Sequence, residues 1–322
     1  MNNRKNIFLI AGDPNSINSE IIYKSWKKLN KKLRKRLYII GSYDLIKKQF
    51  IKLRYKIIIE KIVSLNQLVN TDNFKIINID LKFNHPFNVA KKESSDYILK
   101  CLNLGHILAL KKNTLGLINC AISKNLFKRK KTGVTEYLAN KCKIKDKSEV
   151  MLIKNNNFSV CPLTTHIDLK DVSRSITSKI IVIKIKTILK NFYKIYKKKP
   201  RIGVMGLNPH NAELRPDSEE VEQIIPAIKK LKAQGCKIEG PIVSDTAFIN
   251  KYKKFDIIVG MYHDQVLSPF KSIFKYNAIN LTLGLKYLRA SPDHGVAIDI
   301  IKKNKANALS LMECIKFVNK FG

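Results

Sequence analysis

The sequence lacks the features that stabilise small secreted domains or anchor membrane proteins. Its 322 residues include six cysteines, with no C-x-x-C pair and no zinc-finger spacing, which indicates free thiols in a reducing compartment. No apolar run approaches the roughly 20 residues that span a bilayer. No signal-peptide core precedes the first apolar run, Ile7 to Ala11. We therefore expect a cytoplasmic protein with no membrane partner.

Acidic residues are also scarce. The chain has 25 Asp and Glu against 61 Lys and Arg, a formal net charge of +36. The lysines are spread along the chain, and their densest runs, Lys31–Arg36, Lys128–Lys131 and Lys197–Lys199, lie between predicted helices and strands, as solvated faces do. Because no nucleic-acid-binding motif accompanies the charge, we expect no specific nucleic-acid partner, only weak binding at low salt.

Strands and helices alternate in the first fifty residues. Ile7–Ala11 is predicted to be a buried strand, a helix begins near Ser19, a second strand covers Leu37–Ile40, and a helix covers Tyr43–Phe50. This order favours an α/β fold with a mostly parallel sheet. With 45% hydrophobic residues, the chain can form one large domain or two lobes. Residues 51 to 85 give no clear pattern.

Three predicted strands, ending near residues 163, 206 and 261, are each followed by a histidine: His166, His210 and His263. One such histidine is more often a hydrogen-bonded residue at a strand end than a ligand. Three at equivalent positions in a parallel sheet, or across a subunit contact, can meet at one point. Imidazoles suit Zn, Co, Ni or Fe, and three ligands with open positions indicate a catalytic metal. Asp264 either orients the His263 imidazole or caps a turn.

Cationic and polar residues near the C-terminus point to an anion pocket. Arg289 offers a planar fork for a carboxylate or phosphate, with Lys271 and Asn280 near it in sequence. The alternative for Arg289 is a surface salt bridge. Lys124 lies five residues beyond the strand that ends at Asn119, so it either reaches the crevice or is solvated. Thr135 lies in the predicted first turn of a helix.

Several strings in the second half resemble one family in order and spacing. They are Thr164-Thr165-His166, Gly206-Leu-Asn-Pro-His210, Gly240-Pro-x-x-x-Asp245-Thr246, Met261-Tyr-His-Asp-Gln265 and Asn280-x-Thr-Leu-Gly-Leu285. With these strings the chain resembles the 4-hydroxythreonine-4-phosphate dehydrogenases of vitamin B6 synthesis over nearly its whole length.

The resemblance implies a two-lobed α/β/α fold with mostly parallel sheets, similar to isocitrate and isopropylmalate dehydrogenases and not a Rossmann fold. No G-x-G-x-x-G follows the first strand, which agrees with this expectation. We expect a cofactor-side lobe of residues 1–125 and 270–322 and a metal-binding and dimerisation lobe of residues 126–269. The family is a homodimer whose active site is shared between subunits.

The resemblance also implies the reaction, which is NAD- or NADP-dependent oxidation of 4-phosphooxy-L-threonine to a β-keto acid that loses CO2 to form 3-amino-2-oxopropyl phosphate. The resemblance further implies that the three histidines hold one divalent metal (Zn, Mg or Co) per active site. The remaining roles implied are substrate binding by Thr135, Lys271, Asn280 and Arg289, and cofactor binding by His294 and Asp299. For the proton-transfer path of this reaction, Lys124 and Asp245 are the candidate residues.

The chain departs from the family pattern at several positions. Val134 replaces a substrate-binding histidine. Ser16 and Asn18 stand in a glycine-rich turn that is expected to be strained, Cys120-Ala121 replaces Gly-Pro, Asn211-Ala212 replaces Ala-Gly, and Lys302 and Asn304 replace glycines. Two alternatives follow from these changes: a dehydrogenase of another phosphorylated hydroxy acid, or a non-catalytic basic binding protein.

Overall fold

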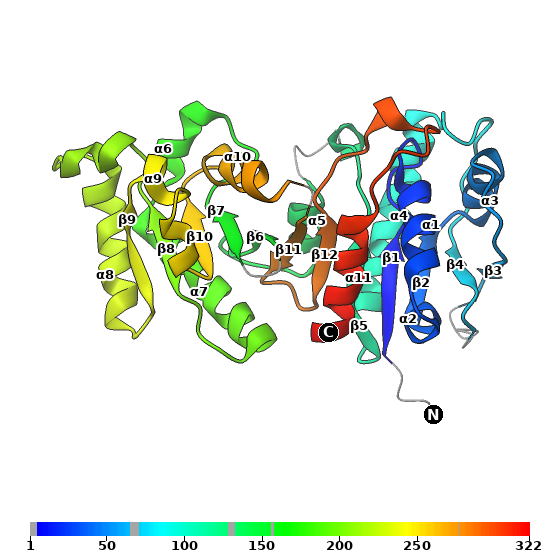
Figure 1. The fold of residues 1–322 in the computed structure, drawn as a ribbon, viewed down its shortest axis with the longest axis horizontal. Coiled ribbons are helices and arrows are strands. Elements are labelled where there is room, and N and C mark those ends of the chain that lie inside the picture. Colours follow the sequence, from blue (N-terminus) through cyan, green and yellow to red (C-terminus); the bar gives the residue numbers. More distant parts are fainter. Residues whose placement is uncertain (1–4, 65–70, 128–132, 156–157, 276) are drawn as a thin grey trace. The chain divides into compact units, whose positions relative to one another are not determined.

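The computed structural model describes residues 5–64, 71–127, 133–155, 158–275 and 277–322. The chain divides into two compact units (Figure 1). Unit 1 comprises Met1–Cys142 and Leu285–Gly322, and unit 2 comprises Lys143–Gly284. The basic run Lys128–Lys131 lies outside the described residues.

Unit 1 contains a parallel sheet whose strands follow the order β3-β4-β2-β1-β5-β12. The strands are β1 (Asn6–Ile10), β2 (Leu37–Gly41), β3 (Ile59–Ile62), β4 (Phe74–Asn78), β5 (Thr114–Asn119) and β12 (Arg289–Pro292). Every residue of β1 and of β2 is buried, as the short continuous apolar runs predict for central parallel strands.

Helices cover both faces of the unit 1 sheet. They are α1 (Asn18–Lys28), α2 (Lys31–Arg36), α3 (Tyr43–Lys52), α4 (Lys91–Ala109), α5 (Val134–Lys141) and α11 (Leu309–Phe321), with 3-10 turns η2 (Lys124–Phe127) and η7 (Ile298–Ile300). α1 packs against α3 and α11 on one face, and α4 packs against β1 and β5 on the other (Figure 1). This is an α/β/α arrangement.

Unit 2 contains strands in the order β11-β6-β7-β10-β8-β9, of which β7, β10, β8 and β9 are mutually parallel and β6 is antiparallel to both of its neighbours. The strands are β6 (Val150–Lys154), β7 (Ser159–Pro162), β8 (Ile202–Met205), β9 (Ile238–Ile242), β10 (Ile257–Gly260) and β11 (Ile279–Leu283). The parallel group therefore presents four carboxyl ends at one edge of the sheet.

The helices of unit 2 are α6 (Val172–Ser175), α7 (Ser178–Tyr196), α8 (Ile225–Ala233), α9 (Ser244–Ala247) and α10 (His263–Phe274). Short turns are η3 (Leu169–Asp171), η4 (Pro209–Leu214), the π-helical η5 (Glu220–Ile224) and η6 (Lys251–Lys254). α7 packs against α8, and α10 packs on β7 and β10. An aromatic and aliphatic cluster that includes Phe158, Phe255 and Phe270 fills the space beneath α10.

The unit boundaries differ from those expected from the sequence, 125/126 and 269/270. Helix α5 belongs to unit 1 because it packs against α4, where the Tyr137 hydroxyl donates to Asn103 Oδ1 at 2.8 Å. β11 belongs to unit 2 because it pairs with β6 over five residues, from Ile279 to Leu283. Thr135 and Asn280 consequently lie in the opposite units to those expected.

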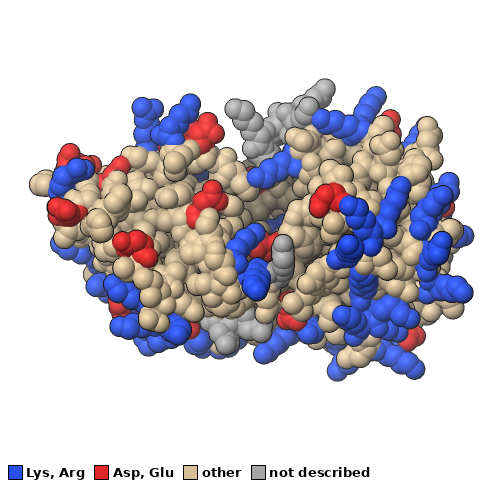
Figure 2. Space-filling view, turned by 45° about the horizontal axis from the view of Figure 1, so that its top comes forward, with Lys and Arg blue, Asp and Glu red and all other residues tan. Residues whose placement is uncertain are grey.

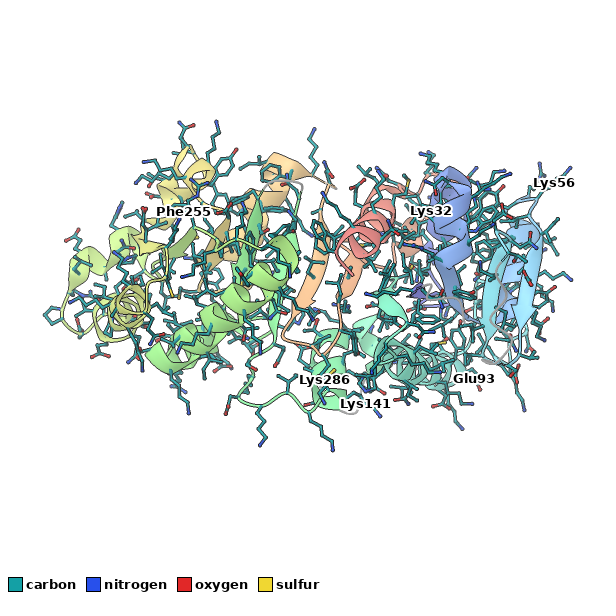
Figure 3. All side chains as sticks on the ribbon, turned by 90° about the horizontal axis from the view of Figure 1, so that it is seen from below. Lys32, Lys56, Glu93, Lys141, Phe255 and Lys286 are labelled. Atoms are coloured by element: carbon teal, nitrogen blue, oxygen red, sulfur yellow. The ribbon has the colours of Figure 1, made fainter. Side chains whose placement is uncertain are left out.

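Lysine and arginine side chains are scattered over the surface shown in Figure 2 and form no single stripe. Lys32 and Lys56 are exposed on unit 1 (Figure 3). Lys141 and Lys286 both act on His106, whose pKa is lowered mainly by burial and further by these two charges (Figure 3). Among the described residues, no helix is both long and apolar enough to cross a bilayer.

Candidate active site

The four parallel strands of unit 2 bring four predicted site residues to the same edge of the sheet. His166 follows β7, His210 follows β8, Asp245 follows β9 and His263 follows β10. Since β10 lies between β7 and β8 in the sheet, His263 takes the central position. Carboxyl ends of parallel strands are where ligands bind in open α/β sheets, because the connecting loops there are free to carry polar groups.

His166 and His263 are brought together. Their ring centroids are 5.8 Å apart. The loop of His166 is tied to the end of β10, since Thr164 donates to Met261 O from its backbone N at 3.1 Å and from Oγ1 at 2.7 Å. His263 Nδ1 and Asp264 Oδ1 are 2.7 Å apart. His263 Nδ1 therefore has a carboxylate partner, the contact expected if Asp264 orients the imidazole.

His210 lies in a cavity of about 290 Å³ at the same edge of the sheet. Asp245, Tyr262 and Gln265 also line this cavity, so the structure brings the third histidine close to one of the two predicted proton-transfer residues. Within the described part of the chain, however, no three His, Cys, Asp or Glu side chains are grouped closely enough to hold a metal ion. One chain thus supplies a histidine pair and, separately, His210.

The two unit 2 residues expected to bind substrate differ in burial. Lys271 is exposed on the last turns of α10, and Asn280 is partly buried on β11. Asn280 Oδ1 is buried and accepts no hydrogen bond from the residues that the structure describes. A buried amide oxygen without a donor is costly unless a ligand or water supplies one, which fits a substrate contact.

In unit 1, a buried guanidinium joins two other polar side chains. Arg289 Nε donates to Asn119 Oδ1 at 2.8 Å, and Nη1 donates to Thr135 Oγ1 at 3.4 Å. Burial lowers the pKa of Arg289 to about 10, so the group remains charged at neutral pH. The predicted alternative, a surface salt bridge, is wrong, because Arg289 is only 3% exposed. Two predicted substrate residues, Thr135 and Arg289, are therefore adjacent.

Comparison with known proteins identifies the family. The model of the family described as pyridoxal phosphate biosynthetic protein PdxA matches residues 32–318. The 4-hydroxythreonine-4-phosphate dehydrogenase of Sulfurihydrogenibium sp. is 37% identical, covering 96% of this chain and 95% of the relative. The 4-hydroxythreonine-4-phosphate dehydrogenase of Aquifex aeolicus is 35% identical, covering 98% of this chain and 97% of the relative. The chain belongs to the PdxA family.

Solved structures agree with this result. The crystal structure of 4-hydroxythreonine-4-phosphate dehydrogenase from Klebsiella pneumoniae superposes with a TM-score of 0.83 at 26% identity, covering 98% of each chain. An isocitrate dehydrogenase from Methylococcus capsulatus shares the fold, with a TM-score of 0.50 at 11% identity. The predicted fold class, α/β with mostly parallel sheets and similar to isocitrate dehydrogenase, is confirmed.

The residues at which this chain departs from the PdxA pattern fall into two groups. Lys302 and Asn304 have φ of 66° and 54°, and Asn211 and Ala212 have φ of 58° and 51°. These four positions use backbone conformations that favour glycine. Strain in the turn after β1 was also expected, and this was wrong: neither Ser16 nor Asn18 has positive φ. Instead, Ser16 Oγ donates to Asp13 O at 2.5 Å and Asn18 Nδ2 to Ala121 O at 2.8 Å.

Val134 occupies the first position of α5, immediately before Thr135. Glu136 Oε2 accepts a hydrogen bond from Gly133 N at 3.0 Å, which fixes the start of the helix. The valine is half-buried and has no polar atom beyond its backbone. The Thr135 hydroxyl and the Arg289 guanidinium therefore remain, while the side chain beside them contributes only apolar surface.

The residues predicted to bind the cofactor lie in unit 1. His294 Nδ1 is 2.9 Å from Gly295 O, and its Nε2 is buried without a partner among the described residues. Asp299 is exposed in η7. This segment meets the start of α1, where Ile17 N donates to Val296 O at 3.2 Å. Lys124 is exposed at the start of η2, next to Ser123, whose backbone N donates to Asp13 Oδ2 at 3.2 Å.

The histidines at the unit 2 edge suit a divalent metal in their donor chemistry. His263 carries the carboxylate partner typical of a metal-binding imidazole, and His166 lies beside it. A site with three protein ligands needs one donor more than this pair. His210 of the same chain or of a second copy is the imidazole that can complete it.

Sequence reasoning missed three residues that build these sites. Asn119 holds Arg289, Glu220 holds the loop before His210, and Gln265 donates to Gly206 O at 2.7 Å. The signals were present but weak: Asn119 ends a predicted strand, and Glu219-Glu220 is an acidic pair in a chain poor in acids. Gln265 belongs to the Met261–Gln265 string itself.

Proposed function

We propose that the protein oxidises the 3-hydroxyl of 4-phosphooxy-L-threonine with NAD or NADP. A hydride passes to the nicotinamide and a proton is released, giving 2-amino-3-oxo-4-phosphooxybutanoate. This β-keto acid then loses CO2 to form 3-amino-2-oxopropyl phosphate, a step of pyridoxal 5'-phosphate synthesis. The observation that carries the proposal is the pair of adjacent imidazoles, His166 and His263, at the carboxyl edge of unit 2 in a chain of the PdxA family.

In this proposal His166, His210 and His263 hold one divalent metal, Zn, Mg or Co. When bound, the metal acts as a Lewis acid on the substrate oxygen, lowering the pKa of the hydroxyl and withdrawing charge from the carbonyl during decarboxylation. Asp264 keeps the His263 ring in one orientation through its 2.7 Å hydrogen bond, so Nε2 faces away from the carboxylate. Asp245 lines the same cavity as His210, which supports assigning it to the proton-transfer path.

The anionic ends of the substrate are assigned to the cationic and polar residues. Arg289 and Thr135 form one preorganised contact, since Asn119 holds the guanidinium in place at 2.8 Å. Lys271 and Asn280 provide the others, and the buried Asn280 Oδ1 can accept from the substrate ammonium. Preorganised donors of this kind hold the reacting C–H toward the nicotinamide.

The cofactor is assigned to the segment that contains His294 and Asp299, and Lys124 to the proton path. His294 Nε2 has no partner among the described residues, so a cofactor hydroxyl or ring nitrogen can pair with it. The exposed Asp299 carboxylate can accept hydrogen bonds from a ribose.

We further propose a homodimer with the active site at the subunit interface. Among the described residues of unit 2, five large aliphatic side chains are 40% or more exposed, and all of them follow site segments in sequence: Ile167, Leu169, Leu214, Ile249 and Ile273. Each lies within four residues of a proposed site residue, and exposed apolar side chains near a site fit a surface that a partner covers. Mixing His210→Ala and Arg289→Ala variants should restore activity if the sites are shared.

The test of the function is reduction of NAD or NADP by purified protein with 4-phosphooxy-L-threonine, with and without Zn, Co or Mg. Wild type should turn over in a metal-dependent way, and His263→Ala should not. The matched control is His85→Ala, which removes an exposed histidine of unit 1 outside the proposed site. Equal silence of folded wild type and His263→Ala would contradict the proposal.

Val134 favours a second candidate substrate class, a phosphorylated hydroxy acid other than 4-phosphooxy-L-threonine. A valine beside Thr135 and Arg289 leaves room for a phosphorylated hydroxy acid of different shape. The Val134→His variant should gain about tenfold in kcat/KM for 4-phosphooxy-L-threonine, as one hydrogen bond to an anion is worth about 1.5 kcal/mol. If wild type prefers another acid in a substrate panel and Val134→His reverses that preference, the specificity assignment changes but the reaction class does not.

A further inference from the structure

We propose that Glu220 is a positioning residue for His210, acting through the loop Gly206–Leu214 without touching the substrate. The loop connects β8 to unit 2's π-helical turn and carries the candidate metal ligand. The proposal deepens the proposed function, and it rests on that function for the role of His210 but not for the conformation of the loop.

The carboxylate of Glu220 is fully buried, at 0% exposure. Its Oε1 accepts hydrogen bonds from the backbone N–H of Leu207 at 2.7 Å and of Asn208 at 2.8 Å. Its Oε2 accepts from Asn208 Nδ2 at 2.9 Å. One side chain thus satisfies two consecutive backbone donors and the side-chain amide of Asn208, just before Pro209 and His210.

Glu220 is the first residue of the π-helical turn Glu220–Ile224, which precedes α8. A π turn inserts an extra residue and changes the direction in which the first side chain points, and such turns are frequent at functional sites. Here the neighbouring Glu219 also points to the loop, with Oε2 accepting from Asn208 Nδ2 at 2.7 Å. The hydrogen bond from Ser173 has the largest effect and lowers the pKa of Glu219; burial opposes it, and the hydrogen bond from Asn208 lowers the pKa further.

The loop needs external support because its own conformation is unfavourable. From His210 to Leu214, five consecutive residues have φ between 48° and 58°, and none is glycine. Left-handed backbone costs about 1–2 kcal/mol for each non-glycine residue. A strained segment persists only when the groups around it over-determine it.

Other residues hold the loop from its opposite side. Gln265 Nε2 donates to Gly206 O at 2.7 Å, and Asn211 Nδ2 donates to Pro241 O at 3.1 Å. Gly206 itself is tightly enclosed: a Cβ there would lie 2.1 Å from Asn211 Oδ1 and 3.0 Å from Glu220 Oε1. Glu220 differs from Gln265 and Asn211 in that it binds two successive backbone N–H groups of the loop.

The experiment compares Glu220→Ala, Glu220→Gln and Glu222→Ala in the full-length protein. Glu222 is exposed on the same π-helical turn, so its variant is the matched control. Three readouts are taken: hydrogen–deuterium exchange of residues 206–214 in metal-free protein, zinc affinity by competition with a chromophoric chelator, and kcat and KM. Thermal melts identify any variant that fails to fold.

In Glu220→Ala, the backbone amides of the loop should exchange at least about tenfold faster than in wild type. The variant should also bind zinc about 10–100-fold more weakly, because metal affinity falls by this factor when a residue that supports a ligand is lost. Glu220→Gln keeps an oxygen for both backbone donors and should remain within about threefold of wild type. Exchange in Glu220→Ala no faster than in Glu222→Ala would overturn the proposal, as would unchanged zinc affinity in a variant of lowered Tm. If Glu220→Ala does not fold, Glu220→Asp takes its place: its carboxylate is one methylene too short to reach both backbone donors, so its loop exchange must exceed that of Glu222→Ala.

These outcomes separate the two proposals. If wild type binds no zinc and has no activity, the proposed function is contradicted. Faster loop exchange in Glu220→Ala would in that case still show that Glu220 holds the loop. Active, zinc-binding wild type with no effect of Glu220→Ala on exchange or affinity would remove the positioning role alone.

Discussion

Asp256 is a residue whose environment makes stability depend on pH. Its Oδ2 accepts from Arg201 N at 2.8 Å, and its Oδ1 lies 3.2 Å from Lys198 Nζ. Burial acts to raise the pKa of Asp256, but the hydrogen bonds and the charges of Lys198 and Arg201 together outweigh it, so the pKa is lowered. The ionised carboxylate therefore stabilises the fold.

The Asp256→Asn variant should lose about 1 kcal/mol of unfolding free energy at pH 7. A lowered carboxyl pKa gives stability that is present above the unfolded pKa of about 3.9 and lost as pH falls through the folded pKa. The difference from wild type should therefore shrink below about pH 4. Urea unfolding across this pH range measures it. Asp217→Asn, whose side chain is 81% exposed, is the control and should change little; a difference for Asp256→Asn that grows in acid would contradict the assignment.

At this scale the sequence predicted the positions of the candidate site residues at strand ends better than it predicted the contacts around them. The three histidines were predicted from strand ends alone, and the strands end where expected. The pairing of His166 with His263, and the separate cavity of His210, depend on strand order, which spacing in a sequence does not contain. The buried state of Arg289 was missed because its partner Asn119 lies 170 residues away.

At the scale of helices and strands, short apolar runs were the most reliable guide. The strands at Ile7, Leu37, Leu115, Ile202 and Ile257 and the helix at Tyr43 lie within a few residues of their predicted positions. Strands β3 and β4 were not assigned, because Glu60 and Lys61 separate the two isoleucines of β3, an edge strand, and Lys75 interrupts the apolar run of β4. α7 was not predicted although it has 19 residues, because its isoleucines are interleaved with lysines.

The end of α7 gives a prediction for a helix cap. Lys197 has φ 56° and ψ 24°, and its N–H donates to Tyr193 O at 2.8 Å, so it closes the helix in the left-handed conformation. Glycine has no Cβ to oppose this conformation. Lys197→Gly should therefore raise the unfolding free energy by about 0.5–1 kcal/mol, after the greater flexibility of glycine in the unfolded chain is subtracted.

The control for this prediction lies in the same helix. Lys194 is exposed in the last turn of α7, where glycine should lower the unfolding free energy by about 0.5–1 kcal/mol. Chemical denaturation of both variants gives opposite signs if the cap assignment is correct. The same sign for Lys197→Gly and Lys194→Gly would show that charge removal, common to both, dominates over backbone conformation.

At the scale of the whole molecule, two units of α/β structure were expected and are present, while their boundaries lie later in the chain than expected. The reason is that the unit to which α5 and β11 belong is decided by what they pack against and not by their neighbours in sequence. α5 packs on α4, and β11 adds to β6 by antiparallel pairing. Neither contact has a short-range signal, because each joins segments far apart in the sequence.

The net charge of +36 gives the last prediction. Cations outnumber anions more than twofold, and the lysines are distributed over the surface, so at low ionic strength they repel one another in the compact state (Figure 2). Between about 0.01 M and 0.1 M salt the Debye length falls from about 30 Å to about 10 Å. Tm should therefore rise with NaCl over this range, because screening removes more repulsion than the few exposed ion pairs contribute.

Sodium phosphate at equal ionic strength is the comparison. Screening alone gives the same increase in Tm for chloride and phosphate, whereas an anion pocket around Arg289 adds a further increase that saturates with phosphate concentration. That additional increase should disappear in Arg289→Ala while the chloride response stays. A Tm that falls with added NaCl would mean that ion pairs such as those of Asp256 outweigh the repulsion among the lysines.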